Sequence, residues 1–280
     1  MVISAHHPSE VRAAVDRAHR EGRRVGFVPT MGALHVGHQS LMARARLECD
    51  LVVVSIFVNP LQFDSRTDFD SYPSTLGADL ELCAREKVDV VYSPNASTMY
   101  PTGFDTRVVV GSIGSVLEGR SRAGHYDGVA TVVAKLLSTV TPDVAYFGQK
   151  DFQQTLVVKR LVADLNVRTE VTVIPTVRDF DGLAMSSRNV RLSHDARRRA
   201  LAIPRALDEV AGMFANGRTD TSSLVAHATT SIEKAGLAVD YVTIADSENL
   251  DPRPVAQAGD VMLIAATVDG VRLIDNAILG

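Results

Sequence analysis

The chain has 280 residues, of which 46% are hydrophobic and 22% charged, and its formal net charge is -4. This composition is typical of a folded globular protein and excludes an intrinsically disordered chain. Nucleic-acid binding gains no support from it, because a phosphate backbone is held mainly by clustered Lys and Arg. The length allows one large domain, or a larger and a smaller one.

Cysteine usage and the first residues of the chain indicate a compartment. Cys49 and Cys83 are the only cysteines, and their wide separation predicts neither a disulfide framework nor a thiolate zinc site. Residues 1–12 lack the apolar block of a secretion signal. No stretch approaches the roughly 20 apolar residues of a membrane span. We therefore expect a cytoplasmic protein with no membrane or nucleic-acid partner.

Short β-rich apolar runs alternate with helical stretches as far as residue 176. This alternation predicts an α/β fold, a parallel sheet with helices on both faces. The expected strands are 25–28, 51–57, 88–92, 144–147 and 170–174, and the expected helices include 42–47, 80–87, 129–140 and 152–165. Because 51–57 is an apolar run of the kind buried on both faces of such a sheet, we expect it to be a central strand.

The pattern changes after Pro175. Two helices are expected at 195–216 and 224–235, and three strands at 239–244, 261–268 and 271–274. The last two strands are joined by Asp269-Gly270, a dipeptide that favours a tight hairpin turn. We therefore predict a smaller α+β domain at 177–280, which follows a larger domain at 1–176.

The strongest functional signal follows the first expected strand, in Met31-Gly32-Ala33-Leu34-His35-Val36-Gly37-His38. A helix that begins here presents unpaired N–H groups and a positive dipole end, which attract phosphate. Gly32 and Gly37 allow close approach of a ligand, and His35 and His38 are spaced to share one helix face. The alternatives are two surface histidines or a zinc pair, although zinc needs further ligands that are not nearby in the sequence.

Two further segments carry cationic side chains. Gly148-Gln149-Lys150-Asp151 follows another expected strand, so that Lys150 lies at the sheet edge where ligands bind and can reach a phosphate. Met185-Ser186-Ser187-Arg188 offers hydroxyls and a guanidinium to a triphosphate, near a boundary that can move. Seen alone, the first segment is better explained as an exposed Lys in a turn with Asp151 as a helix N-cap, and the second as an ordinary loop.

Side-chain amides mark a fourth segment. Asn59 and Gln62 follow the central strand, and Gln154 lies on the helix after Lys150. An amide can donate to a carboxylate and accept from a hydroxyl, as a small hydroxy acid requires. Phe57 and Phe63 would keep such a pocket dry, although without this context they are better explained as core residues beside a strand-end turn.

Taken in this order, the four segments resemble the pantothenate synthetase family, within the nucleotidyltransferase superfamily that shares the His-x-Gly-His signature with class I aminoacyl-tRNA synthetases. The resemblance spans essentially the whole chain. It implies a Rossmann-type N-terminal domain, a smaller C-terminal domain that closes over the ATP site, and a homodimer. The implied activity is ATP-dependent ligation of pantoate and β-alanine through a pantoyl-adenylate, giving pantothenate, AMP and pyrophosphate.

The resemblance also assigns site residues. His35, His38, Lys150 and Arg188 would be catalytic, with His38 a candidate proton donor. Gln62 and Gln154 would hold pantoate, with Gln62 also near β-alanine and Asn59 supporting the pocket. The ATP contacts would be Met31, Gly32, Ala33, Leu34, His35, Val36, Gly37, His38, Gly148, Gln149, Lys150, Asp151, Val177, Met185, Ser186, Ser187 and Arg188.

Three segments depart from the family pattern. Gln149 stands where the family has Glu, and Tyr126 and Asp127 stand where it commonly has Phe and often Arg. Where some relatives place magnesium ligands, only Asp79 remains as an oxygen donor. Magnesium, Mg²⁺, is therefore expected to be held chiefly by ATP itself. Two other functions are also compatible with the sequence. One is a nucleotidyltransferase that acts on another acceptor, and the other is a nucleotide-binding regulator without turnover.

Overall fold

A computed structural model describes residues 2–63, 66–70 and 72–280. The chain divides into two compact units, Met1–Gly148 with Gln153–Pro175, and Gln149–Phe152 with Thr176–Gly280. The short segment Gln149–Phe152 thus belongs with the C-terminal unit, whereas the sequence pattern predicted one boundary at residue 176. In the part of the chain that the structure describes, no helix has the length and apolar character needed to cross a membrane.

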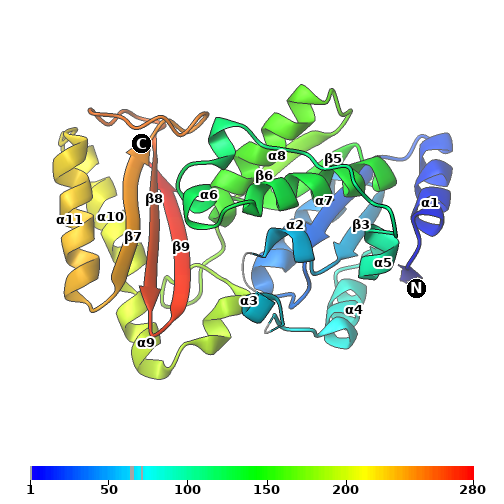
Figure 1. The fold of residues 1–280 in the computed structure, drawn as a ribbon, viewed down its shortest axis with the longest axis horizontal. Coiled ribbons are helices and arrows are strands. Elements are labelled where there is room, and N and C mark those ends of the chain that lie inside the picture. The colour runs from blue at the N-terminus through cyan, green and yellow to red at the C-terminus, as the bar shows by residue number, and fades with distance from the viewer. Residues whose placement is uncertain (1, 64–65, 71) are drawn as a thin grey trace. The chain divides into compact units, whose positions relative to one another are not determined.

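The first unit contains a six-stranded, fully parallel sheet with the strand order β1-β4-β3-β2-β5-β6 (Figure 1). Its strands are β1 (Ile3–Ala5), β2 (Val25–Thr30), β3 (Leu51–Ile56), β4 (Val90–Tyr92), β5 (Val144–Gly148) and β6 (Glu170–Ile174). The α/β class and the central place of the apolar run at β3 are confirmed.

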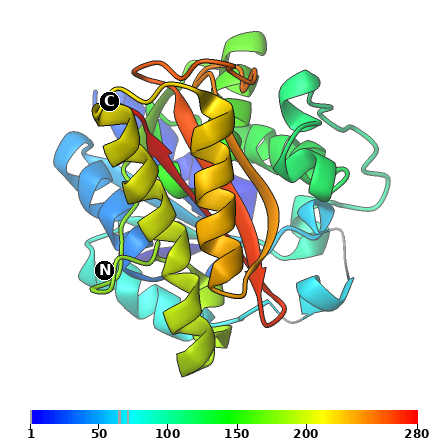
Figure 2. The same cartoon turned by 90° about the vertical axis from the view of Figure 1, so that its left-hand side faces the viewer.

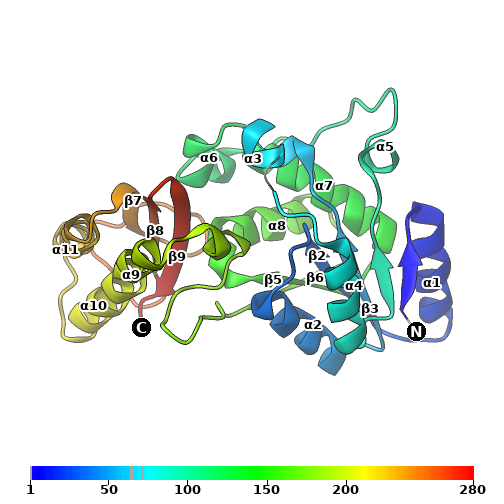
Figure 3. The same cartoon turned by 90° about the horizontal axis from the view of Figure 1, so that it is seen from below.

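Helices cover both faces of this sheet (Figure 3). One face carries α2 (Val36–Glu48) and α4 (Leu76–Arg85), and the other carries α1 (Pro8–Arg20), α7 (His125–Val140) and α8 (Phe152–Asp164). Under α2 and α4, buried side chains such as Met42, Val54 and Tyr146 form one apolar cluster. The short helices α3 (Arg66–Asp70), α5 (Ala96–Met99) and α6 (Glu118–Ser121) lie in connections.

The sequence pattern did not predict β1. Its three residues form an edge strand with only Ala5 buried, which is too short for a recognisable alternation. The following α1 was not predicted either, although it buries Val11, Val15 and Ala18 at helical spacing.

Strand β2 is the point at which the order of the sheet reverses. It pairs with β3 on one side and with β5 on the other. In a parallel sheet, ligands bind outside the carboxyl ends of the strands at such a reversal. The ends concerned are Thr30, Ile56 and Gly148.

The second unit has a three-stranded antiparallel sheet of β7 (Ala238–Ala245), β8 (Val261–Val268) and β9 (Val271–Ile278). Helices α9 (His194–Ala200), α10 (Ala202–Ala215) and α11 (Thr221–Lys234) complete it, and Figure 2 shows α10 and α11 across one face of the sheet. Helix and strand side chains share a single buried cluster. The turn between β8 and β9 has positive φ at Asp269 and Gly270, 47° and 77°, as the dipeptide predicted.

Two expected elements differ in this unit. The helix expected at 195–216 is two helices that meet at Leu201. Pro204 explains the break, because its ring has no N–H and crowds the carbonyl of Ala200. The strand expected at 271–274 continues to Ile278.

Gly128 in α7 provides a test of how the first unit packs. A Cβ added there would lie 2.2 Å from the carbonyl oxygen of Leu61, a backbone atom of the 3-10 turn η1 (Pro60–Gln62). We expect Gly128→Ala to lower the free energy of unfolding by about 1–3 kcal/mol, because the turn must move. The matched control is Gly212→Ala in α10, where an added Cβ meets nothing within 4 Å.

The control change should raise stability by about 0.5–1 kcal/mol, as expected for glycine replaced in a helix. Urea unfolding of the two variants measures both effects. A Gly128→Ala protein as stable as the wild type would contradict the close packing of α7 on η1.

Candidate active site

The loop that follows β2 turns sharply before α2 begins. Gly32 and Ala33 both have left-handed backbone conformations, with φ of 84° and 50°. A Cβ at Gly32 would lie 3.0 Å from Oδ2 of Asp79. Glycine therefore meets both the conformation and the space that this position requires.

Asp79 of α4 holds this loop in place. Its Oδ2 accepts hydrogen bonds from the Ala33 N–H at 3.0 Å and the Thr75 hydroxyl at 3.2 Å, and its Oδ1 accepts from the Leu34 N–H at 2.8 Å. The side chain is buried. Three of the roughly four lone-pair sites of a carboxylate are thus occupied.

Asp79 does not fit the expected role of a magnesium ligand, because its oxygens are committed to the loop. Within residues 2–63, 66–70 and 72–280, no group of three or more His, Cys, Asp or Glu side chains could hold a metal ion. The Asp79 carboxylate instead holds the loop after β2 through the N–H groups of Ala33 and Leu34.

His35 and His38 lie together at the start of α2, with ring centroids 4.2 Å apart. His35 is the N-cap, and its Nδ1 accepts from the Gly37 N–H at 3.1 Å. The Nδ1 of His38 accepts in turn from the His35 N–H at 3.2 Å. Because each Nδ1 is an acceptor, each neutral ring carries its proton on Nε2.

Asn59 lies shortly after β3 and is buried. Its side chain donates two hydrogen bonds and accepts two. Its amide nitrogen donates to Gln62 Oε1 at 3.0 Å and to the Gly128 carbonyl at 3.1 Å. Its Oδ1 accepts from the Leu61 N–H at 3.3 Å and the Tyr100 hydroxyl at 2.7 Å. Burial raises the pKa of Tyr100, so that this hydroxyl remains a donor.

Gln62 is fixed from several sides. Its Nε2 donates to the sulfur of Met31 at 3.0 Å, which joins the amide segment to the loop after β2. Its main-chain carbonyl accepts from His125 Nδ1 at 2.7 Å and from Arg122 at 3.3 Å. In the sequence, the segment around His125 stood out only for its departures from the family, and its support of the amide site was not predicted.

The two departures in α7 have structural roles. Tyr126 is buried, and its ring centroid lies 4.9 Å from that of His125. The Asp127 carboxylate accepts from the Val110 N–H at 2.8 Å.

Gln154 and its neighbour on α8 differ in surroundings. Gln154 is half-buried. Gln153 is buried, accepts from the Glu118 N–H at 3.1 Å, and donates to the carbonyls of Ile113 and Val116 at 2.8 Å each. Gln153 therefore holds in place the connection that contains Ile113, Val116 and Glu118. The sequence did not indicate that Gln153 and the neighbouring Gln154 have different surroundings.

In the second unit, Gln149–Asp151 forms the 3-10 turn η3. The Lys150 side chain is 19% exposed, and its Nζ lies 3.6 Å from Oδ1 of Asp151. The main chain of this turn is bound by Asn276 of β9, whose Nδ2 donates to the carbonyls of Gln149 and Lys150.

Residues 177–185 form a tight reversal that brings two expected ATP contacts together. The Met185 N–H donates to the Val177 carbonyl at 2.9 Å, and Arg178 pairs with buried Asp275 of β9 through two bonds of 2.6 and 3.1 Å. Arg197 binds Asp181, and this hydrogen bond lowers the pKa of the Asp181 carboxyl.

The next residues continue into the 3-10 helix η4 (Ser187–Arg191). Ser186 is its N-cap, with Oγ accepting from the Arg188 N–H at 3.2 Å. Ser187 and Arg188 are half-buried.

The expected site residues therefore form two sets. Met31–His38, Asn59, Gln62, Gly148 and Gln154 belong to the first unit, whereas Gln149–Asp151, Val177 and Met185–Arg188 belong to the second. Within the first unit, the bond from Gln62 to Met31 joins the amide segment to the histidine loop. Within the second, the bond from Met185 to Val177 joins two of the expected ATP contacts.

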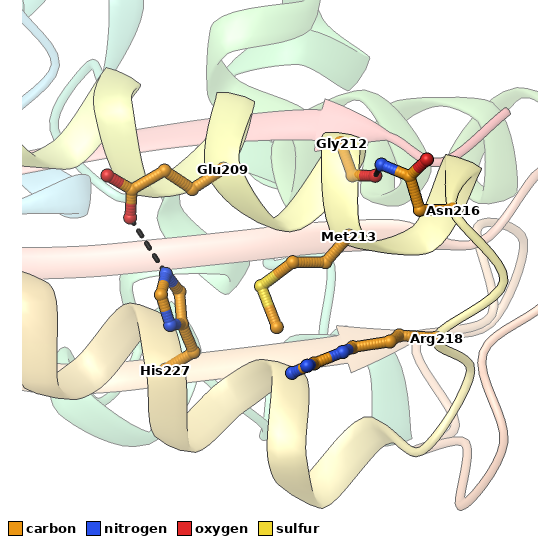
Figure 4. A pocket seen from close by; sticks show the side chains of 6 residues that line it. All are labelled: Glu209, Gly212, Met213, Asn216, Arg218 and His227. Carbon is orange, nitrogen blue, oxygen red and sulfur yellow. Dashed lines mark hydrogen bonds and ion pairs between the residues drawn. The ribbon is translucent and has the colours of Figure 1, made fainter.

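A separate hollow of about 600 Å³ lies between α10 and α11 (Figure 4). Its lining includes His227, whose Nε2 is 2.8 Å from Glu209 Oε2. None of the predicted site residues lines it.

Known proteins resemble this chain over nearly its full length. Residues 3–278 match the Pantoate-beta-alanine ligase family. The pantothenate synthetase of Pelotomaculum thermopropionicum is 48% identical over 273 residues, 97% of each chain, and that of Aquifex aeolicus is 48% identical over 91% of each.

Solved structures agree in fold. Pantothenate synthetase from Thermus thermophilus has a TM-score of 0.94 at 42% identity and covers 99% of both chains. Pantoate-beta-alanine ligase from Francisella tularensis, complexed with beta-gamma ATP and beta-alanine, has a TM-score of 0.83 at 34% identity and covers 99% of this chain and 98% of its own. The chain belongs to the pantoate-beta-alanine ligase family.

Proposed function

We propose that this chain joins pantoate to β-alanine with ATP, through a pantoyl-adenylate, and releases pantothenate, AMP and pyrophosphate. The observation that carries the proposal is the family match over residues 3–278. The Francisella tularensis relative, solved with a form of ATP and β-alanine, supports these two ligands. As expected of the family, we propose a homodimer that acts in the cytoplasm.

Four side chains are assigned to the triphosphate. His35 and His38 carry Nε2–H groups that can donate to phosphate oxygens, because their Nδ1 atoms cap α2. Lys150 and Arg188 supply positive charge, and Arg188 follows two hydroxyls that can also donate. The expected ATP contacts from Met31 to His38, Gly148 to Asp151, and Val177 with Met185 to Arg188 complete this proposed site.

Pantoate is assigned to Gln62 and Gln154. Gln62 has a second amide N–H besides the one directed at Met31, and this group can donate to the substrate. Asn59 holds Gln62 by the 3.0 Å bond to its Oε1, so we propose a positioning role for Asn59 in place of substrate contact.

The first half-reaction needs no general base. The pantoate carboxylate is ionised at neutral pH, because unperturbed carboxyl groups titrate near pH ~4. Its oxygen attacks the α-phosphorus while the bond to pyrophosphate breaks. Lys150, Arg188 and the two imidazoles stabilise the charge that moves onto the leaving group, and such positioning supplies most of the catalysis. Magnesium is proposed to accompany the triphosphate, since Asp79 is engaged elsewhere.

The second half-reaction forms the amide bond. The β-alanine nitrogen attacks the pantoyl carbonyl as a neutral amine, and AMP leaves. Water must be kept from the adenylate until then. Phe57 and Phe63 flank the amide segment in the chain, and each packs against a second ring: the centroids of Phe57 and Tyr100 lie 6.0 Å apart, and those of Phe63 and Phe69 lie 5.3 Å apart. We propose that these rings help to keep water out.

Replacing the proposed phosphate donors tests the first half-reaction. We expect Lys150→Ala and His38→Asn each to slow pantoate-dependent exchange of labelled pyrophosphate into ATP about a hundredfold, because one transition-state contact is lost. Asn is chosen at position 38 because its amide can replace Nδ1 as the cap acceptor while lacking Nε2–H. Lys159→Ala, at an exposed position on α8, is the control.

Near wild-type exchange in either variant would contradict the assignment of that residue. Exchange that ignores pantoate and responds to another acid or nucleotide would instead favour a different transferase.

The two cysteines give a second prediction. Both are buried, and burial raises the pKa of Cys49 and raises that of Cys83 to about 12. Neither thiol is thus an available nucleophile. Intact mass measurement after incubation with ATP and pantoate should find the protein unmodified, and a pantoyl adduct on either cysteine would exclude direct transfer from the adenylate.

Asp79→Asn separates support of the loop from metal binding. The amide nitrogen cannot accept from the N–H groups of Ala33 or Leu34, so the half-saturating ATP concentration should rise roughly tenfold, the cost of one charged hydrogen bond. The half-saturating magnesium concentration should stay unchanged. Glu81→Gln, an exposed carboxylate on the same helix, is the control. A rise in the magnesium requirement alone would reinstate Asp79 as a metal ligand.

A further inference from the structure

Asn276 is a buried amide in β9, only 2% exposed, that binds a turn far away in the sequence. Its Nδ2 donates to the Gln149 carbonyl at 2.9 Å and to the Lys150 carbonyl at 3.0 Å. Its Oδ1 accepts from Gln149 Nε2 at 3.2 Å. The Asn276 side chain thus forms hydrogen bonds with two successive carbonyl groups and with the Gln149 side chain.

The chemistry of these partners fixes which end of the amide is which. Two backbone carbonyls can only accept, so the NH₂ group of Asn276 must face them. Its Oδ1 therefore faces the Gln149 side chain, which must supply a hydrogen-bond donor. The pair is satisfied in one orientation only, with glutamine rather than glutamate at position 149.

The strand that carries Asn276 is well anchored. Asn276 is paired with Leu263 of β8 in the antiparallel sheet, and the preceding Asp275 is held by Arg178. The turn η3, by contrast, is a single 3-10 turn. The rigid strand therefore sets the position of the turn, and through it the Cα from which the Lys150 side chain projects.

We infer that Asn276 is a positioning residue for adenylate formation, which orients Lys150 by holding the carbonyls of Gln149 and Lys150. The inference rests on the proposed function of Lys150. It also assigns a role to Gln149, which stands where the family has Glu. The Gln149 side chain donates the third hydrogen bond that Asn276 forms with the turn.

Asn276→Asp tests the inference with almost no change in volume. Its carboxylate would face two carbonyl oxygens and could not donate, so the turn should shift. A displacement of about 1 Å can slow a reaction roughly a hundredfold, and we expect pantoate-dependent pyrophosphate exchange to fall by about ten- to a hundredfold. Formation of pantothenate from added pantoyl-adenylate and β-alanine should change less than about twofold, because no triphosphate is present in that step.

The split between the half-reactions distinguishes positioning from loss of folded protein, which would lower both rates equally. Adding Asn276→Asp to Lys150→Ala should cost little more than Lys150→Ala alone, since the first residue acts through the second. Gln149→Glu is a milder second variant that keeps both carbonyl bonds, and it should show the same split with a smaller loss. Arg272→Gln on β9, which breaks the ion pair with Asp240, is the control and should leave both half-reactions unchanged.

The outcomes separate the two proposals. A wild-type protein without pantoate-dependent exchange would overturn the proposed function itself. With wild-type exchange present, equal rates in Asn276→Asp and wild type, equal loss in both half-reactions, or additive loss with Lys150→Ala would overturn the positioning role. If Asn276→Asp does not fold, Gln149→Glu decides in the same way.

Discussion

The parallel pairing of β2 with β3 on one side and β5 on the other is the constraint on which the proposed site depends. It brings three strand ends to one edge of the sheet, and the chain leaves each end into a segment that carries chemistry. After β2 come the glycine turn and the two histidines, after β3 the amides Asn59 and Gln62, and after β5 the Lys150 turn. The strand ends from which these three segments begin therefore lie at the same edge of the sheet.

A second layer of buried polar side chains then shapes each loop. Asp79 binds the N–H groups of the loop after β2, Asn59 orients Gln62, and Asn276 holds the carbonyls beside Lys150. All three side chains are buried and engaged, so they are suited to hold other groups in place and not to touch substrate. Preorganisation of this kind is what a reaction driven by charge placement requires, because the donors must be in position before pyrophosphate leaves. It also explains why Asp and Asn, which are common in active sites, hold loops in place here.

Much of the fold was predictable because local pattern determines it. The apolar runs of β2 to β6 and the Asp269-Gly270 turn were recognised, whereas β1 has too few residues to form a pattern, and Pro204 splits a continuous helical periodicity. Candidate site residues could be proposed from the sequence where a motif is contiguous, as in Met31–His38, and their roles stay predictions. A role that depends on distant partners was not predictable: Asp79 meets its loop 45 residues away, and Asn276 meets Gln149 127 residues away. Likewise, Gln153 is buried and Gln154 is half-buried because the two side chains leave α8 in different directions, which the sequence did not indicate.

The path of one oxygen atom tests the chemistry most directly. If the carboxylate of pantoate attacks the α-phosphorus, and the amine of β-alanine later breaks the bond between the pantoyl carbon and that oxygen, then pantoate labelled with ¹⁸O in its carboxylate must transfer one label to AMP. Mass spectrometry of the products should find AMP with one ¹⁸O atom and pantothenate that retains the other. Unlabelled AMP, or ADP with the label in orthophosphate, would contradict a pantoyl-adenylate and with it the roles proposed for Lys150 and the two histidines.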